Sequence, residues 1–207
     1  MDFTVASYAA WRAEGADGTV AKPDVSFIPP LERRRLTGVE RAALAVAWQV
    51  RPEGEVPVVF ASRWGEIGVT LKLMTQFHAD REMSPAGFSA SVHNAAPGAF
   101  SLLTHNHAPY TAIAARERSL EAGLLEALMQ GAVVFVFAEE ATPAFYAPAF
   151  GPLQPACALA VRLEPGGPCR ADFRSAECPP VSFDAADVFF SGRADALEAA
   201  SFTLTRT

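Results

Sequence analysis

Residues 92–119 read VHNAAPGAFSLLTHNHAPYTAIAARERS, and the elements in and after this stretch set the predicted architecture. Pro97 can open a helix over GAFSLLTHN, because its fixed φ suits a first helical turn. APYTAIAA, residues 108–115, mixes small and β-branched residues and predicts a strand. A helix is expected over RSLEAGLLEALMQ and a strand over AVVFVFAEE. The stretch therefore predicts a repeating helix–strand order.

The same order is predicted upstream. Thr37 and Glu40 have the spacing of a capping box, and a helix is expected over VERAALAVAWQV. VPVVFAS, residues 56–62, is apolar throughout and predicts a buried parallel strand. A helix is expected through LKLMTQFHAD. Ser84 and Pro85 have the chemistry of an N-cap and a first turn for a further helix over AGFSASVHN.

Alternating strands and helices predict one α/β domain over residues 1–207. Its sheet is expected to have five strands, mainly parallel, with helices on both faces. ACALAVRLE, residues 156–164, is the last regular strand expected. The tail, residues 166–207, is predicted to hold a short helix over ADALEAA and an extended end, SFTLTRT. Another short helix is expected at Ala6–Glu14.

Charge and hydropathy argue against several functions. The 207 residues carry a net charge of −6 and are 50% hydrophobic, so a large core is expected and no nucleic-acid partner. The one compact basic cluster, ERRRL at 32–36, is expected to be a solvated or ion-paired turn. No apolar run reaches the roughly 20 residues that span a bilayer, and no secretory signal is recognisable. The expected location is the cytoplasm.

The cysteines and histidines predict no metal site. Cys157, Cys169 and Cys178 are odd in number and form no CxxC pair, so reduced thiols are expected. His105 and His107 would point in different directions on a helix, which is a poor arrangement for two ligands. No metal and no other cofactor is expected, and the sequence has no GxSxG elbow of a hydrolase.

Five motifs in order resemble the N-terminal half of the β-ketoacyl synthases, members of the thiolase-like superfamily. They are RRRLTGVERAALAVA, VVFASRWGEI, SPAGFSASVHNAAPGAFSL, the strand that begins near Pro109, and GLLEALMQGAVVFVFAEE. The resemblance covers residues 20–165 and implies a half-thiolase fold, with 166–207 as a family-specific tail. Each motif alone is weak, and their order and spacing carry the resemblance.

Condensing enzymes of this family place a cysteine at the N-terminus of the helix after that strand, where the helix dipole lowers the thiol pKa. Counted from Asn94, the corresponding position is Glu117, with no cysteine near it in the sequence. A carboxylate cannot form the acyl thioester. The family's second half supplies two histidines, or a histidine and an asparagine, for decarboxylation. None of the four histidines matches them, and the chain is expected to end before that half.

The resemblance therefore implies a relative without catalytic residues. It is similar to the short chain-length-factor-like proteins of aryl-polyene, type II polyketide and fatty-acid-like systems. Such a protein pairs with a full-length ketosynthase as a heterodimer and meets acyl carrier protein only indirectly; in isolation, a homodimer is the alternative. Two other functions stay open: a stand-alone enzyme on acyl-carrier or acyl-CoA thioesters, and a purely structural thiolase-like module.

The resemblance also names candidate site residues. Thiolase-like proteins dimerise through the strand before the nucleophile, here Pro109, Tyr110, Thr111, Ala112, Ile113 and Ala114. Candidates for lining the acyl tunnel of a neighbouring ketosynthase are Phe88, Phe100 and Leu103. For Ile113 and the phenylalanines, packing in the chain's own core is the alternative. The charges of Arg116, Glu117, Arg118 and Glu121 fit a helix start that is wet or meets a polar partner surface.

Overall fold

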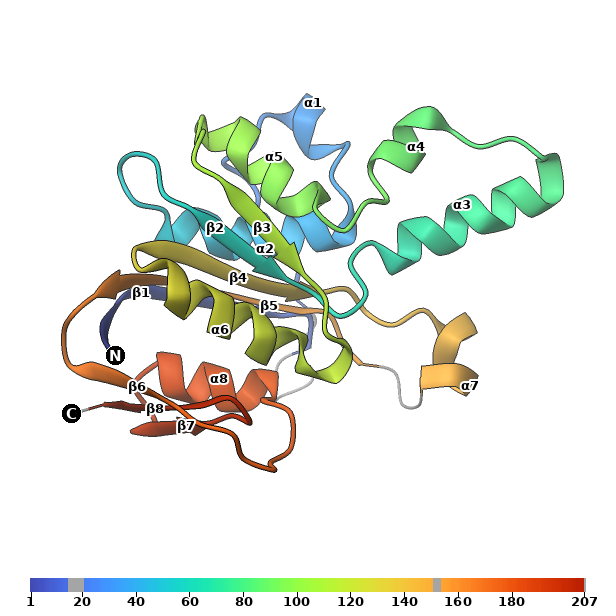
Figure 1. The fold of residues 1–207 in the computed structure, drawn as a ribbon. Helices are drawn as coiled ribbons and strands as arrows, with labels where there is room; N and C mark the ends of the chain where they lie inside the picture. The colour runs from blue at the N-terminus through green and yellow to red at the C-terminus, as the bar shows by residue number, and fades with distance from the viewer. Residues whose placement is uncertain (15–20, 151–153, 207) are drawn as a thin grey trace.

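The computed structural model describes residues 1–14, 21–150 and 154–206 (Figure 1). These residues form one sheet of eight strands in the order β3-β2-β4-β5-β1-β6-β8-β7. The strands are β1 Asp2–Arg12, β2 Val58–Ala61, β3 Tyr110–Ile113, β4 Val133–Glu139, β5 Cys157–Pro165, β6 Cys169–Phe173, β7 Ala196–Glu198 and β8 Phe202–Arg206. The helices are α1 Pro30–Arg33, α2 Gly38–Val50, α3 Ile67–Asp80, α4 Pro85–Ser89, α5 Ala95–Thr104, α6 Ser119–Gln130, α7 Ala147–Phe150 and α8 Phe183–Phe190.

Helices cover both faces of the sheet, because the central strands are apolar at successive positions and successive side chains point to opposite faces. Val59 and Phe135 belong to a core cluster with α6 and α8. Phe60 and Val134 belong to a second cluster with α2 and α5, on the opposite face (Figure 1). The predicted α/β fold with helices on both faces is therefore confirmed, and so is β2 as a buried parallel strand.

The predicted sheet of five mainly parallel strands was wrong. Among the described strands, β2 pairs parallel with β3 and β4, and every other pair is antiparallel. The cause lies between β4 and β5, where Pro143, Pro148 and Pro155 interrupt the chain. The described part of this segment forms only short helices, so no long crossover helix returns the chain to the starting edge. β5 consequently pairs antiparallel with β4.

The helix predicted at Ala6–Glu14 was also wrong, because β1 occupies residues 2–12. β1 lies between β5 and β6, and its register runs from Phe3 opposite Pro165 to Arg12 opposite Cys157. Thr, Val, Tyr and Trp in this segment favour strands. Pairing along most of its length outweighs the weak helix preference of its alanines.

The tail continues the sheet instead of remaining irregular. The helix predicted over ADALEAA was wrong, since Ala196–Glu198 forms the edge strand β7. A helix forms earlier, at α8, where the hydroxyl of Ser182 accepts a hydrogen bond from the N–H of Ala185 (3.1 Å). The extended end is confirmed as β8. Strands β6, β8 and β7 pass beneath α6 and α8, and Phe189 and Phe202 share one core with Leu124 of α6 (Figure 1).

Local capping signals predicted two helix starts correctly. The N–H of Thr37 donates to the Glu40 carboxylate (2.7 Å), and the N–H of Glu40 donates to the Thr37 hydroxyl (3.0 Å), which completes the capping box of α2. The Ser84 hydroxyl accepts from the N–H of Gly87 (3.2 Å) and caps α4. That helix ends at Ser89, earlier than predicted.

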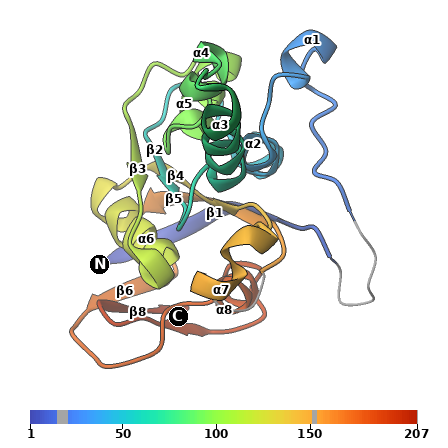
Figure 2. The same cartoon turned by 90° about the vertical axis from the view of Figure 1, so that its right-hand side faces the viewer.

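Helices α3 and α4, here called the arm (residues 67–89), project away from the body of the sheet (Figures 1 and 2). Ile67 and Leu73 are the buried residues of α3, and α4 has none. Met74, Phe77 and Phe88 are exposed large apolar side chains on the arm. The arm therefore presents apolar surface that the described part of the chain leaves uncovered.

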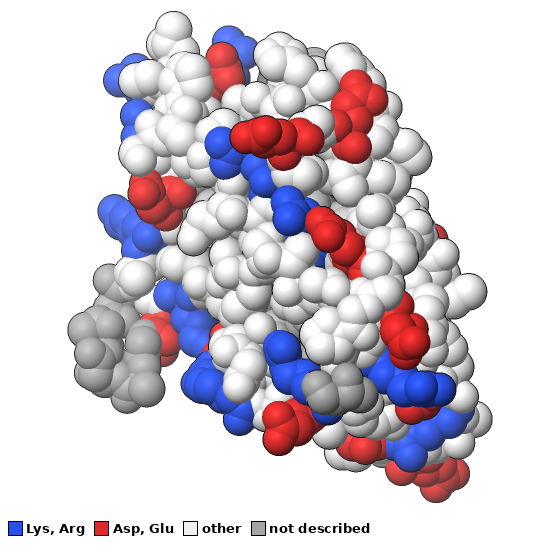
Figure 3. Space-filling model, turned by 90° about the vertical axis from the view of Figure 1, so that its left-hand side faces the viewer, with Lys and Arg blue, Asp and Glu red and all other residues white. Residues whose placement is uncertain are grey.

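Charge is not gathered into patches of one sign on the face that carries the α2–β2 loop. Basic and acidic side chains are interspersed there among uncharged residues (Figure 3). No helix within the described ranges is long and apolar enough to cross a membrane.

Candidate functional site

β3 forms one end of the sheet, so one of its edges has no strand partner among the described residues. The N–H of Val58 donates to the carbonyl of Pro109 (3.1 Å), and the N–H of Ser62 donates to the carbonyl of Ile113 (3.1 Å). Backbone groups of alternate residues face the neighbouring strand in a parallel pair. The N–H and C=O groups of Tyr110 and Ala112 therefore point to the free edge, where a strand of another chain can pair with them.

The side chains of β3 lie above and below this edge. Ile113 packs against the core on the α6 side, and Ala112 packs against the core on the α2 side. Tyr110 is 39% exposed and lies over α5, because a Cβ built on Gly98 would be 3.5 Å from its hydroxyl. The structure thus places the residues from Pro109 to Ala114 on or beside one free edge. Their role at an interface stays a prediction, and Ile113 also serves the chain's own core.

The three candidate tunnel residues do not lie together. Phe88 is 59% exposed on the arm. Phe100 is buried in the α2 side core, and Leu103 packs partly buried against the same core. Phe100 and Leu103 line one cavity near the C-terminal end of α5, well away from Phe88 along the chain. Their contribution to an acyl tunnel stays a prediction.

Glu117 lies in a short 3₁₀ turn, Arg116–Arg118, between β3 and α6. Its carboxylate forms an ion pair with the guanidinium of Arg63 (2.6 Å), and its side chain is 55% exposed. The hydroxyl of Ser119 accepts a hydrogen bond from the N–H of Ala115 (2.9 Å). The start of α6 is thus occupied by the chain's own polar groups, and Arg116 and Glu117 are exposed there.

Glu121, in the first turn of α6, is not exposed, contrary to the expectation of a solvated or partner-facing charge. It is buried, and its carboxylate accepts hydrogen bonds from Arg118 (2.8 Å) and from the backbone N–H of Ala200 (2.9 Å). Arg118 also donates to the carbonyl of Cys178 (2.8 Å). The tail therefore covers this side of α6. Sequence reasoning missed the contact because no local pattern joins positions so far apart in the chain.

The three cysteines are free thiols at different places in the fold. Cys157 begins β5 opposite Glu139, and burial raises the pKa of its thiol to about 12. Cys169 is buried on β6. Cys178 contributes its backbone carbonyl near the start of α6, where it accepts a hydrogen bond from Arg118.

Carboxylates gather at the root of the arm, where β2 leads into α3. Glu139 accepts hydrogen bonds from the Ser62 hydroxyl (3.1 Å) and from the N–H of Arg63, and burial raises its pKa to about 7. Glu140 accepts from the N–H of Gly68 in the first turn of α3, and burial raises its pKa as well. These two carboxylates hold the backbone that starts the arm.

Glu66 is the third carboxylate of this root, and it is only 3% exposed. One oxygen accepts a hydrogen bond from the Thr37 hydroxyl (2.8 Å), and the other is buried without a partner. Burial raises the pKa of Glu66 to about 8, and the negative charges of Glu40 and Glu140 add to this effect. Among the described residues no group of three or more His, Cys, Asp and Glu side chains could hold a metal ion.

The edge strand β3 leads through a short turn into α6, in a sheet whose two faces are covered by helices. The model of the β-ketoacyl synthase N-terminal domain matches residues 8–187, and the chain belongs to this family. No curated protein sequence matches the chain.

Solved structures share the fold at low sequence identity. A chain from the ketosynthase ApeO in complex with its chain length factor ApeC, from Xenorhabdus doucetiae, is similar with a TM-score of 0.80 and 21% identity, and the match covers 100% of both chains. A chain of the ishigamide ketosynthase/chain length factor is similar with a TM-score of 0.66 and 15% identity, over 93% of this chain and 72% of that one. A β-ketoacyl synthase from Burkholderia phymatum STM815 is similar with a TM-score of 0.53 and 14% identity, over 86% of this chain and 58% of that one.

Proposed function

We propose that this chain is the non-catalytic, chain-length-factor-like partner of an active ketosynthase. It forms a heterodimer in the cytoplasm and acts in type II polyketide, aryl-polyene or fatty-acid-like biosynthesis. Acyl carrier protein is reached through the ketosynthase. Two structures with the same fold, ApeO with ApeC and the ishigamide pair, contain such partners and support this assignment.

The observation that carries the proposal is the state of the nucleophile position. Glu117 stands there, tied to Arg63 by an ion pair, and a carboxylate cannot take the place of a thiolate in forming a thioester. The start of α6, where the helix dipole would stabilise a thiolate, is closed by Ser119, Arg118 and the tail. Chemistry on an acyl chain therefore has to come from another subunit.

The free edge of β3 supports a partner that adds a strand. The outward N–H and C=O groups of Tyr110 and Ala112 supply the hydrogen bonds, and the exposed apolar side chain of Leu102 supplies contact area on α5, which packs beside β3. Stable interfaces of this kind bury more than roughly 2,000 Å² in total, with apolar centres.

Replacing Ala112 by proline tests the proposal at the edge itself. Proline removes the outward N–H of residue 112, whereas the pairing of β3 with β2 uses the neighbouring residues. The chain is co-expressed with a ketosynthase encoded beside it, and the mass of the complex is measured by size-exclusion chromatography with light scattering. We expect wild type to form the heterodimer and Ala112→Pro to remain a folded monomer by circular dichroism.

Glu53→Ala, at an exposed loop position, is the control and should assemble like wild type. A heterodimer formed equally well by Ala112→Pro would show that the edge of β3 is not the interface. Failure of wild type to bind any co-encoded ketosynthase would overturn the proposed function.

A further inference from the structure

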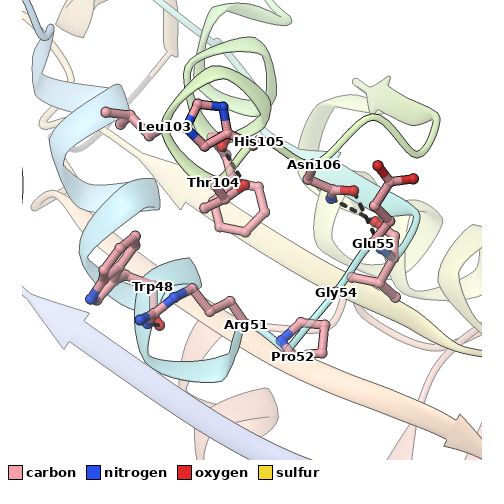
Figure 4. Close-up of a pocket in the computed structure, with 11 residues that line it drawn as sticks. Trp48, Arg51, Pro52, Gly54, Glu55, Leu103, Thr104, His105 and Asn106 are labelled. Carbon is pink, nitrogen blue, oxygen red and sulfur yellow. Dashed lines mark hydrogen bonds between the residues drawn. The ribbon is translucent and has the colours of Figure 1, made fainter.

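A cavity of about 250 Å³ lies at the opposite end of α5 from the arm. It is enclosed by the last turn of α2, the loop that leads to β2, and the last turn of α5 with the residues after it (Figure 4). Apolar cavities of about 150 Å³ hold a benzene ring, so this space accepts one ring with a substituent. Two of the candidate tunnel residues, Phe100 and Leu103, line it, whereas the interface proposed at β3 does not involve it.

One wall of the cavity is a fixed guanidinium. Arg51 lies over the ring of Trp48 at 3.4 Å, and the ring of Phe27 stacks on Trp48, with centroids 4.2 Å apart and planes 8° apart. Arg51 also donates a hydrogen bond to the carbonyl of Trp48. This column orders a side chain that would otherwise be flexible, so less entropy is lost when it binds a ligand.

The charge of Arg51 is available for a ligand. Within the described ranges Arg51 forms no ion pair with a carboxylate, and the hydrogen bond to Trp48 uses only one of its five N–H groups. Planar guanidinium groups bind carboxylates through two parallel hydrogen bonds, which are among the strongest in proteins. Glu55 also lines the cavity, but its carboxylate lies on the side of Asn106, away from Arg51 (Figure 4). The Arg51 wall therefore favours an anion with a planar carboxylate.

The base of the cavity is apolar, and its two sides are tied together. Val56 and Phe100 are buried, and Leu103 is partly buried beside them. The side-chain amide of Asn106 donates to the carbonyl of Val56 (2.8 Å) and accepts from the N–H of Val56 (3.3 Å), which joins the α2–β2 loop to the segment after α5 (Figure 4). The cavity is thus formed in advance, as small-molecule sites usually are.

We propose that this cavity binds a small carboxylate with a compact apolar body, of the size of benzoate. The carboxylate takes the free N–H groups of Arg51, and the apolar body rests on Phe100 and Leu103. Binding requires both parts, because the anion alone gains no apolar contact and the neutral body alone gains no charge-assisted hydrogen bond.

The test uses benzoate, benzamide and acetate as probes of the purified chain. Ligand-observed NMR titration gives the dissociation constants, and the indole N–H signal of Trp48 in a ¹H–¹⁵N spectrum reports where the probe binds. About nine non-hydrogen atoms support a dissociation constant of about 1 mM for benzoate. Benzamide and acetate should each bind at least ~10-fold more weakly, since each lacks one of the two contacts.

Arg51→Gln should weaken benzoate binding by ~10-fold or more, because it removes the positive charge and the paired N–H groups of the planar guanidinium. Arg81→Gln is the matched control: Arg81 also lies over an aromatic ring at a helix end, 6.0 Å from Phe77, but outside the cavity. It should leave benzoate binding unchanged within a factor of two. The Trp48 signal in wild type needs no variant and locates the probe even if Arg51→Gln fails to fold.

Three results would overturn the inference: no shift of the Trp48 signal at high benzoate concentration, equal binding of benzamide or acetate, or undiminished binding to a folded Arg51→Gln chain.

Discussion

Replacing Glu66 by glutamine should stabilise the protein at neutral and mildly alkaline pH. Glutamine keeps an oxygen that accepts from the Thr37 hydroxyl, and it removes the charge that Glu66 would carry near Glu40 and Glu140. Protonated glutamate and glutamine have nearly the same shape. The two proteins should therefore be almost equally stable at low pH and differ as the pH rises.

The size and sign of the effect follow from the pKa of Glu66. Its value is about 8 in the folded chain, against an ordinary value of 4.5. Below 4.5 both the folded and unfolded chains hold the proton. Between 4.5 and 8 only the unfolded chain ionises, so the free energy of unfolding falls as the pH rises. This rise in the pKa of Glu66 corresponds to a loss of at most about 5 kcal/mol in the free energy of unfolding. Water that enters the root of the arm would solvate the ionised carboxylate and reduce this loss of stability to a few kcal/mol.

Urea denaturation followed by circular dichroism, at steps from about pH 5 to about pH 8, measures the effect. Wild type should lose stability across this range. Glu139, with a pKa of about 7, adds a parallel loss that both proteins share. Glu66→Gln should therefore fall less steeply, and the exposed-site variant Glu53→Gln should follow wild type. Identical slopes for wild type and Glu66→Gln would refute the buried, protonated state of Glu66.

Gly123→Ala should cost about 1–3 kcal/mol in urea denaturation, because its Cβ would lie 2.5 Å from the Cβ of Ala61. Gly98→Ala, another helical glycine with its nearest contact at 3.5 Å, should be neutral or stabilising, and an equal loss at both sites would contradict the packing argument. Ile113→Asp should unfold the chain, as circular dichroism would show, because that side chain packs on its own core. The purified chain should give no condensation product and no acyl adduct by mass spectrometry with acyl and malonyl carrier-protein thioesters. Glu117→Cys alone should not restore activity, because the substitution adds a nucleophile without the histidines that transfer protons in condensing enzymes. An acyl adduct on one of the native cysteines would contradict the prediction that the chain is catalytically inactive.

Local signals in the sequence predicted the central part of the fold. The Thr37–Glu40 capping box and the apolar run of β2 depend on neighbouring residues and on burial at both faces, so the sequence alone reveals them. β1 and β7 were missed because distant strands stabilise them against a local helix preference. The direction of β5 was missed because the chain's return path depends on loop geometry.

The sequence likewise predicted one part of the candidate site and missed another. The sequence located β3, because the strand follows from the order of motifs, whereas the assignment of Glu117 to the nucleophile position stays a prediction. The sequence did not indicate that Glu66 is buried. It also did not indicate the hydrogen bond from the N–H of Ala200 to the Glu121 carboxylate, because no sequence pattern links these two positions. Burial of a charged side chain is decided by elements that meet only in the folded chain.

The position of β1 has a consequence for biosynthesis. This strand precedes the other described strands in the chain but pairs with β5 and β6, so Phe3 meets Pro165 only after the residues between them have been translated. At ribosomal rates of about 5–20 residues per second, β1 waits about 10–30 s without its neighbours. During that time both edges of an 11-residue strand are bare, so nascent chains at high density are exposed to mispairing with one another. Slower translation before residue 157 would lengthen this interval and lower the yield of folded protein.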